Sequence, residues 1–302
     1  MKKKAKLRAV ENIAKYIFTI CAVIAIFAVC SITAYMIAKG TTAFTKVGVL
    51  ELLFGSTWKP TAEEPSYGIL YIILTSIVGT GISVLIGVPI GLLTAVFLTE
   101  VSNKKLAMIV QPAVELLAAI PSVIYGLFGL MILNPLMYKL EKIIFADSEN
   151  HQFTGGSNLI SAVIVLAVMI LPTVVNVSAS SIRAVSKDIR AASLALGASR
   201  IQTIFKVTIP AAKSGIMTGA VLGIGRALGE AMAINMVAGG TVNIPLPFNS
   251  VRFLTTQLVS EMGYAEGLHR QVLFTVGLVL YVFIMAVNLI LQKIRKGATL
   301  DE

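Results

Sequence analysis

The sequence predicts an all-α integral membrane protein with six transmembrane helices. Of its 302 residues, 56% are hydrophobic and only 13% are charged, whereas soluble domains average about 25% charged residues. The apolar residues gather in segments of the length that a bilayer requires, about 20 residues. Lys and Arg residues concentrate in alternate connecting segments. The formal net charge of +10 therefore indicates membrane topology rather than nucleic-acid binding.

Six segments are long and apolar enough to span a membrane. They are residues 16–38, 69–98, 106–133, 159–179, 214–238 and 272–292. The first follows a basic stretch, but it is too long for a removed signal peptide and has no small-residue cleavage site, so we expect a retained anchor. The third is the least regular, because it is interrupted by Gln111, Pro112, Glu115 and Pro121.

Six spans place both termini on one side, and the distribution of Lys and Arg predicts that this side is the cytoplasm. With that orientation, 17 of the 25 basic residues lie inside, 7 lie outside and Arg226 lies within a span. The long connections are then external at 39–68 and 239–271 and cytoplasmic at 180–213, and a polar external loop covers 147–158. We divide the chain into an N-terminal tail, anchor and external segment (1–68), a core (69–292) and a cytoplasmic tail (293–302).

The sequence offers no catalytic or metal-binding constellation. Cys21 and Cys30 share one apolar segment, which predicts neither a disulfide framework nor a metal site. His151 and His269 fall in predicted loops. The sequence contains no G-x-x-x-x-G-K-[ST] phosphate loop. We therefore expect no bound cofactor and no enzymatic activity, and any ATP must be bound by another chain.

The cytoplasmic segment 180–213 predicts two short helices around a glycine turn. Ser186 is a candidate N-cap with Asp188 in the first turn, and Ile189, Ala192 and Leu196 form an apolar stripe. Gly197 predicts the helix end, since glycine accepts a left-handed conformation. We expect the second helix at 199–207, ending before Pro210. Such a projection fits a groove on a cytoplasmic partner. Alternatively, the basic loop lies on anionic lipid headgroups.

This segment resembles the "EAA" loop of ABC importer permeases, which reads E-A-A, three residues, Gly, nine residues and I-x-L-P. Ala192, Gly197, Val207, Ile209 and Pro210 match it or substitute conservatively, whereas Ala191 replaces the glutamate and Ser193 the second alanine. The resemblance implies a coupling helix that receives the movement of an ATPase. The candidate coupling residues are Lys187, Arg190, Ala192, Leu196, Gly197, Ala198 and Pro210.

Three further stretches extend the resemblance over nearly the whole chain from about residue 50. They are "FGSTWKPTAEEPSYGILYIILTSIVGT" (54–80), "AAIPSVIYGLFGL" (118–130) and "GRALGEAMAINMVAGG" (225–240). Together they are similar to the permease subunits of the phosphate-specific ABC importer. Trp58, Pro60, Tyr67 and Gly68 favour the PstC type over the PstA type.

The resemblance implies a MetI-like permease core in the inner membrane that forms half of a phosphate path. It also implies a PstA-like permease partner, a PstB-like ATPase dimer and a PstS-like phosphate-binding protein outside. Of the two long external connections, 239–271 is the one we expect to receive the binding protein.

The fifth predicted span combines glycines and charges on one face. On a helical wheel, Gly215, Gly219 and Gly223 form a stripe that continues through Arg226 and Glu230. Small residues at this spacing allow close helix packing. The opposite face is bulky and suits lipid, and its residues are Met217, Val221, Ile224, Leu228 and Met232.

Two interpretations of the charges remain open. Arg226 and Glu230, four residues apart, could form an intrahelical ion pair that fixes packing. Alternatively, Arg226 contacts a translocating anion and Glu230 holds or releases the guanidinium, because a planar guanidinium suits phosphate oxygens. An ionised side chain facing lipid would cost roughly 2.5–3.5 kcal/mol.

Glu115, Ser122 and Tyr125 are further candidates for the substrate path. Glu115 either pairs with Arg226 or with a partner subunit, or lies wetted near the cytoplasmic end of its span. The Ser122 and Tyr125 hydroxyls either face the anion or serve the fold; serines within spans commonly bond the preceding turn.

Two alternative functions stay open beside the phosphate importer. One is a permease for another oxyanion, such as phosphonate, sulfate or molybdate. The other is a carrier or channel that needs no ATPase, against which the two-helix cytoplasmic projection argues.

Overall fold

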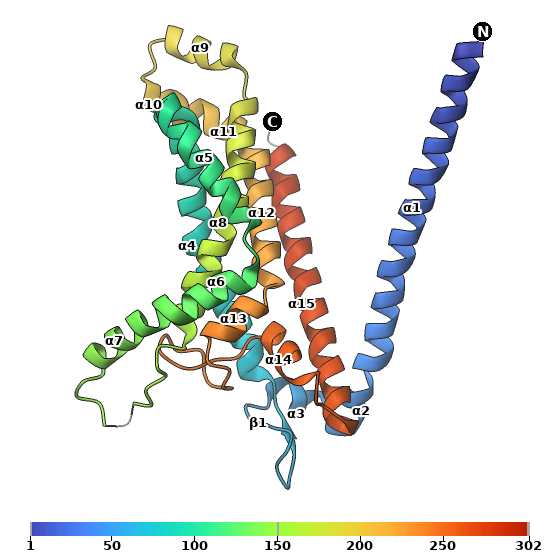
Figure 1. The fold of residues 1–302 in the computed structure, drawn as a ribbon, viewed down its shortest axis with the longest axis vertical. Helices are drawn as coiled ribbons and strands as arrows, with labels where there is room; N and C mark the ends of the chain where they lie inside the picture. The colour runs from blue at the N-terminus through green and yellow to red at the C-terminus, as the bar shows by residue number, and fades with distance from the viewer. Residues whose placement is uncertain (1, 150, 301–302) are drawn as a thin grey trace.

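The computed structural model describes residues 2–149 and 151–300, and their secondary structure is almost wholly helical. Long helices run along the long axis of the molecule, and both chain ends lie at the end that carries the 187–195 helix (Figure 1). The elements are α1 (Lys2–Gly40), α2 (Thr42–Val47), α3 (Val49–Phe54), β1 (Trp58–Lys59), β2 (Ser66–Tyr67), α4 (Leu70–Val96), the π-helical η1 (Phe97–Val101), α5 (Lys104–Ala119), α6 (Ser122–Phe128), η2 (Gly129–Leu133), α7 (Asn134–Ile144), α8 (Leu159–Ala184), α9 (Lys187–Ala195), α10 (Arg200–Thr203), η3 (Ile204–Thr208), α11 (Ile209–Ala211), α12 (Lys213–Leu228), α13 (Met232–Val237), α14 (Leu254–Glu261) and α15 (Gly267–Leu300).

Five helical stretches within the described chain are long and apolar enough to cross a membrane, and a bent pair makes a sixth. The five are Glu11–Val47, Leu70–Val101, Ser122–Ile144, Leu159–Ala184 and Gly267–Lys293. The pair is Arg200–Ala211 with Lys213–Leu228, bent by 69°. The all-α membrane fold with six spans is therefore confirmed. The described chain also contains a small two-stranded sheet, the β1–β2 hairpin.

The bounds of the third predicted span, 106–133, are wrong. The chain breaks at Ile120 and Pro121, between α5 and α6, and the candidate span runs from Ser122 to Ile144. Pro121 has no N–H and cannot continue the hydrogen-bonding ladder of α5. Pro112, by contrast, lies inside α5 without ending it. In Figure 1, α6 and α7 leave the bundle at a steep angle to α5.

The fifth predicted span, 214–238, is also not one helix. α12 ends at Leu228, and α13 begins at Met232 after a short break. Glycine at 229 lowers the helix propensity of this turn. The Glu230 amide still bonds the carbonyl of Ala227 in α12, but the Glu230 carboxylate accepts a hydrogen bond from the Ala233 amide of α13.

α8 lies at the centre of the bundle and packs most extensively against α4 and α12. A Cβ at Gly87 of α4 would lie 2.5 Å from Cδ1 of Ile170, and one at Gly91 would lie 2.8 Å from Cγ1 of Val174. Glycines therefore let α4 approach the backbone of α8 closely, as is common between membrane helices.

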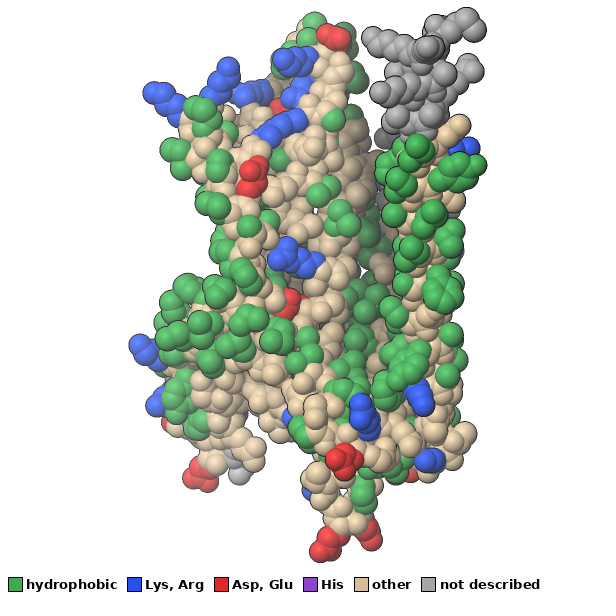
Figure 2. Space-filling model, turned by 45° about the vertical axis from the view of Figure 1, so that its right-hand side comes forward, with side chains coloured by type: hydrophobic (Ala, Val, Ile, Leu, Met, Phe, Trp, Pro, Cys, Tyr) green, Lys and Arg blue, Asp and Glu red, His purple; other side chains and the backbone are tan. Residues whose placement is uncertain are grey.

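α1 contacts the bundle mainly through its last two turns. Thr33 bonds Tyr281 of α15 at 3.0 Å, and Thr275 donates a 2.6 Å hydrogen bond to the carbonyl of Gly40. The remainder of α1 diverges from α15 (Figure 1) and leaves its apolar side chains exposed. Figure 2 shows hydrophobic side chains over this helix and most charged ones towards the two ends of the molecule.

The segment between α8 and α12 forms two helical parts around a glycine turn. Ser186 accepts a hydrogen bond from the Asp188 amide and caps α9, and Gly197 ends it with φ of +85°. The second helical part is longer than the predicted 199–207, because it continues through Pro210 to Ala211. Pro210 lies within this continuous helical part, directly after η3 gives way to α11, and does not end it.

Candidate functional site

Arg226 lies near the end of α12, inside the predicted fifth span, and is partly buried. Within residues 2–149 and 151–300, its guanidinium makes no ion pair and no hydrogen bond. The predicted intrahelical pair with Glu230 is therefore wrong: the helix ends between the two residues, so they are not one turn apart on a common axis. A cation without a partner in a span is costly, which makes Arg226 a candidate functional residue.

Glu230 stabilises the start of α13. Its Oε1 atom accepts a 2.9 Å hydrogen bond from the amide of Ala233, and its carbonyl accepts a 2.7 Å bond from the hydroxyl of Thr255. The side chain thus satisfies an amide that the short helix leaves free. Glu230 belongs to the break in the span and not to a charged stripe.

The glycine face of α12 packs on α8. A Cβ would lie 2.0 Å from Ser181 Oγ at Gly215, 3.2 Å from Val177 Cβ at Gly219 and 2.9 Å from Val174 Cγ2 at Gly223. These glycines are positions of close helix contact.

The opposite face of α12 is not the uniform lipid face that we predicted. Of its predicted residues, Leu228 is buried, three are half-buried (Met217, Val221 and Ile224) and Met232, now in α13, is exposed. The exposed residues of α12 next to Arg226 are Leu222 and Gly225, which lie between the predicted lipid face and the glycine face. Around Arg226 the exposed side of the helix is thus partly glycine, and a Cβ at Gly225 would meet nothing within 4 Å. The arginine lies beside this open strip.

A second helix break lies next to the first. Gly126 of α6 packs against Ala233 of α13, so the breaks between α5 and α6 and between α12 and α13 are neighbours. Tyr125 donates a 2.7 Å hydrogen bond to the carbonyl of Leu117, which has lost a helical partner at Pro121. Tyr125 packs against the buried cluster that contains Ala227, the residue after Arg226.

Ser122 begins α6 and is half-buried. The structure thus brings Arg226, Glu230, Ser122 and Tyr125 to two adjacent helix breaks, one at the start of α6 and one at the end of α12.

Glu115 is not part of this group of charges. It is exposed, and its Oε1 atom accepts a 3.1 Å hydrogen bond from Gln111 Nε2. In the described chain it forms no ion pair with Arg226. Gln111 in turn accepts a hydrogen bond from Arg183. The contact between Gln111 and Glu115 could be deduced from the sequence, since the two residues are four apart on a helix. Nothing in the sequence pointed to Arg183 as a partner of Gln111.

The predicted coupling residues all lie on the projection between α8 and α12. Those exposed on its surface are Lys187, Ala192, Leu196, Gly197 and Pro210, and Ala198 is partly buried. Arg190, also predicted to contact an ATPase, is partly buried and forms a 2.8 Å ion pair with Glu100 of η1. Glu100 was missed, because an acidic residue at a span end carries no distinguishing sequence signal.

The projection also exposes large apolar side chains. Leu196 is 89% exposed and Ile201 is 69% exposed. Ser193 of α9 bonds Thr203 of α10 at 2.9 Å, which fixes the two helices against each other. Exposed apolar residues on a rigid polar projection are typical of a protein contact.

At the opposite end, a buried carboxylate ties three segments together. Glu261 of α14 is 4% exposed and accepts hydrogen bonds from Trp58 Nε1 at 3.0 Å, from Arg252 and from His269 at 2.8 Å. Burial and the Glu261 carboxylate raise the pKa of the nearby Tyr264 hydroxyl, and Arg252 opposes this shift. The predicted external segment 39–68 is thus fixed to 239–271.

A second buried carboxylate orders the polar loop after α7. Glu141 is fully buried and bonds His151 at 2.8 Å and the amide of Thr154 at 2.9 Å. The His151 ring stacks on Phe145 with centroids 3.7 Å apart. Phe145 also contacts Phe248, so this loop meets 239–271.

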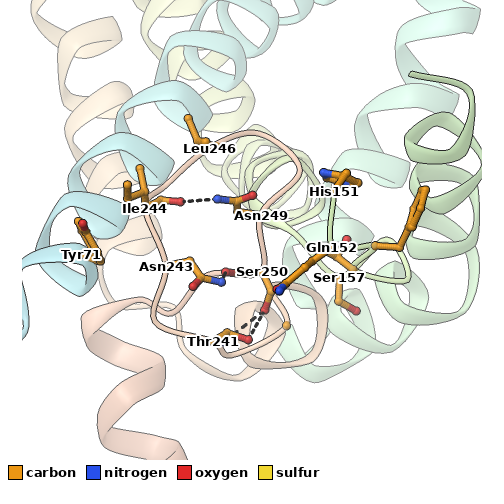
Figure 3. A pocket seen from close by; sticks show the side chains of 13 residues that line it. Tyr71, His151, Gln152, Ser157, Thr241, Asn243, Ile244, Leu246, Asn249 and Ser250 are labelled. Atoms are coloured by element: carbon orange, nitrogen blue, oxygen red, sulfur yellow. Dashed lines mark hydrogen bonds between the residues drawn. The ribbon is translucent and has the colours of Figure 1, made fainter. Parts of the chain in front are cut away.

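A cavity of about 830 Å³ opens between these two loops. Figure 3 shows polar, uncharged side chains around it, among them Gln152, Asn243 and Asn249. Internal hydrogen bonds hold the lining: Thr241 bonds Ser250 at 2.8 Å, and Asn249 donates to the carbonyl of Ile244 at 3.0 Å. The described residues contain no cluster of three or more His, Cys, Asp or Glu that could hold a metal.

The sequence is similar to membrane subunits of bacterial transporters over most of its length. It is 40% identical over 273 residues to the probable ABC transporter permease protein YqgH of Bacillus subtilis, covering 89% of this chain and 85% of that protein. It is 33% identical over 258 residues to the phosphate transport system permease protein PstC of Pasteurella multocida, covering 81% of this chain and 80% of that protein.

The fold is similar to solved ABC transporter structures. A chain of the bacterial alginate ABC transporter, crystallised in complex with an alginate-bound periplasmic protein, matches with a TM-score of 0.64 and 17% identity, covering 91% of this chain and 92% of that one. The inward-facing methionine transporter MetNI matches with a TM-score of 0.53 and 22% identity, covering 76% and 94%. The profile of the binding-protein-dependent transport system inner membrane component matches residues 87–297. The protein therefore belongs to this family of membrane-spanning transport permeases, whose members are transport subunits and not enzymes.

Proposed function

We propose that the protein is the PstC-type membrane subunit of an ATP-driven importer of inorganic phosphate. The observation that carries the proposal is Arg226: a guanidinium in a membrane span, without a partner in the described chain, beside two helix breaks. Several PstC proteins are 30–33% identical to this chain over most of its length, which favours phosphate among the anions.

The chemistry of the site suits a phosphate that passes but does not stay. A guanidinium presents several N–H donors in a fork that matches phosphate oxygens. Ser122 begins α6, whose first amides point towards the break, and a helix N-terminus favours an anion. Because Glu230 is occupied with α13, it does not neutralise Arg226, and the incoming anion would do so.

The projection between α8 and α12 is the proposed contact with the ATPase. Exposed Leu196 and Ile201 supply apolar contact area, and Lys187, Ala192, Gly197, Ala198 and Pro210 surround them. The projection and both chain ends are then cytoplasmic, which agrees with the excess of Lys and Arg at these segments. ATP is bound by the partner, a PstB-like dimer, and not by this chain.

The opposite end is the proposed receiving surface for the phosphate-binding protein, which would be PstS-like. Two ordered loops, 147–158 and 239–271, enclose its polar cavity. The second half of the path is supplied by a PstA-like subunit, for which the exposed strip beside Arg226 leaves room.

Uptake of labelled phosphate by the complete transporter, reconstituted in vesicles, tests the proposal. Arg226→Ala should abolish uptake while the complex still assembles. Lys213→Gln, at the start of the same helix, is the matched control and should leave uptake intact. Normal uptake by Arg226→Ala would contradict the role of Arg226 in the path.

Competition identifies the substrate class. Excess unlabelled phosphate should suppress uptake, whereas sulfate, molybdate and phosphonates should not. Suppression by one of those oxyanions instead would favour the alternative importer. Uptake without any ATPase partner would favour a carrier or channel.

A further inference from the structure

A second polar site lies between Arg226 and the end of the molecule that carries α9. A cavity of about 450 Å³ separates α5 from α8, and its polar lining consists of Gln111, Glu115, Asn176, Ser180 and Arg183. None of the three residues from α8 was singled out by the sequence. Apolar side chains would suffice to pack two membrane helices, so a polar cavity at this position needs an explanation.

The polar residues of α8 follow one side of the helix. Asn176, Ser180 and Arg183 are four and three residues apart, which places them in line. Asn176 is half-buried, whereas Ser180 and Arg183 are exposed. The line therefore opens progressively towards the end of α8, on the face that meets α5 and is turned away from the seam with the glycine face of α12.

Gln111 joins a positive and a negative charge through one amide group. Its Oε1 atom accepts from Arg183, and its Nε2 atom donates to Glu115 at 3.1 Å. This orientation of the amide serves both charges. The guanidinium has five N–H donors, and in the described chain only its bond to Gln111 engages them, so Arg183 can accept an anion without first losing an ion pair.

The axial order of the charges is set by the helix contacts. Gly223 packs on Val174, so Arg226, nearly one turn further along α12, lies about three turns of α8 from Arg183, on the order of 16 Å. Glu115 lies between them: it is one turn beyond Gln111 on α5 and half a turn before Leu117, whose carbonyl is bonded by Tyr125. Along the bundle axis Glu115 therefore lies between the two arginines, on the side of α8 that faces α5.

We propose that Arg183, Gln111 and Glu115 form an inner subsite for inorganic phosphate on its way out of the transporter. This inference rests on the proposed function and adds a second anion contact to it. Arg183 binds the oxyanion in place of the side-chain Oε1 atom of Gln111. Glu115, an acidic group a few ångströms from the same amide, repels it. Transport requires binding that is favourable enough to enter and weak enough to leave, and the opposed charges supply both.

The subsite predicts how phosphate on the α9 side inhibits uptake. In vesicles that hold the complete transporter, ATP and increasing unlabelled phosphate inside, lumenal phosphate should refill the subsite and slow the uptake of labelled phosphate. Glu115→Gln removes the repulsion and should lower the half-inhibiting phosphate concentration by about tenfold. Arg183→Gln should remove the inhibition, and Arg183→Lys should restore part of it.

Lys105→Gln is the matched control, because it removes an exposed cation from α5 at the same end of the molecule. It should leave the half-inhibiting concentration unchanged. Co-purification of the ATPase and basal ATP hydrolysis verify that each variant assembles. A purely structural role for the three residues would lower uptake without moving the half-inhibiting concentration.

The inference is overturned if Arg183→Gln retains inhibition at the wild-type concentration, or if wild type and Glu115→Gln are both insensitive to lumenal phosphate. Either result, with phosphate uptake still dependent on Arg226, removes the inner subsite and leaves the proposed function standing. Failure of the wild-type transporter to take up phosphate removes both.

Discussion

Arg190 of α9 forms a 2.8 Å ion pair with Glu100 of η1, so the projection between α8 and α12 is fixed to the end of α4. The Arg200 guanidinium also donates to the carbonyl of Glu100. Two helices of the projection thereby hold one residue of the bundle. A force applied to α9 is transmitted to α4 through these contacts and not only through the chain that connects α9 to α8.

Glu100→Gln should weaken the connection between ATP hydrolysis and uptake. The substitution keeps the backbone contact with Arg200 but removes the charge that holds Arg190. We expect ATP hydrolysis by the assembled transporter to continue while phosphate uptake per ATP falls several-fold. Asp188→Asn, an exposed acid on α9, is the control. Unchanged uptake per ATP in Glu100→Gln would show that the ion pair does not transmit movement.

Gly223→Ala should destabilise the protein, whereas Gly225→Ala should not. A Cβ at Gly223 would lie 2.9 Å from Val174 Cγ2, but one at Gly225 would meet nothing within 4 Å. We expect a cost of about 1–3 kcal/mol for overpacking at Gly223 and a gain of about 0.5–1 kcal/mol in helix propensity at Gly225. Thermal unfolding of the purified protein in detergent measures both, and equal shifts would contradict the packing of this face on α8.

Tyr125→Phe should cost about 1 kcal/mol of stability, because the carbonyl of Leu117 loses a hydrogen bond. In a Pro121→Ala background the cost should shrink, since the new amide at 121 can reach the same carbonyl along the helix. A double-mutant cycle measured by thermal unfolding gives the coupling. A coupling energy of zero would mean that the tyrosine does not compensate for the proline.

Glu261→Gln should loosen the end of the molecule opposite α9. The Glu261 carboxylate accepts hydrogen bonds from Trp58, Arg252 and His269. Its neutralisation leaves Arg252 without its charge partner. Breaking a buried pair costs about 3–5 kcal/mol, and the partial exposure of Arg252 reduces this to about 2–3 kcal/mol. Limited proteolysis of the 55–68 segment and thermal unfolding report the change, and Glu266→Gln, an exposed neighbour, serves as the control.

The number of spans and the two-part helical projection between α8 and α12 were predictable because both depend on local chemistry. Apolar length identifies a span, and the Ser186 cap and the Gly197 turn are set by residues within a few positions. The break after Leu228 was not predictable from the same rules. A helical wheel assumes a continuous helix. Whether the Glu230 carboxylate turns back towards α12 or forward to the Ala233 amide depends on Thr255 and other residues distant in sequence.

The candidate functional site shows the same division between features set by local sequence and features set by residues distant in the chain. Arg226 stood out as a charge within a span, and it remains without a partner in the described residues. The surroundings of Arg226 could not be deduced, because α6, which carries Ser122 and Tyr125, packs against α13 only after the break at Pro121. Arg190 illustrates the converse: an exposed basic residue on a predicted projection is paired with Glu100, 90 positions earlier.

The central place of α8 bears on how the protein is made. The two most extensive helix contacts of the bundle are those of α8 with α4 and with α12. Both α4 and α8 precede the projection in the chain. Gly87 and Gly91 of α4 can therefore meet Ile170 and Val174 while the C-terminal third is still being synthesised. α12 then docks on a surface that already exists, so a nascent chain that ends after α8 should already contain the more extensive of the two main helix contacts of the finished molecule.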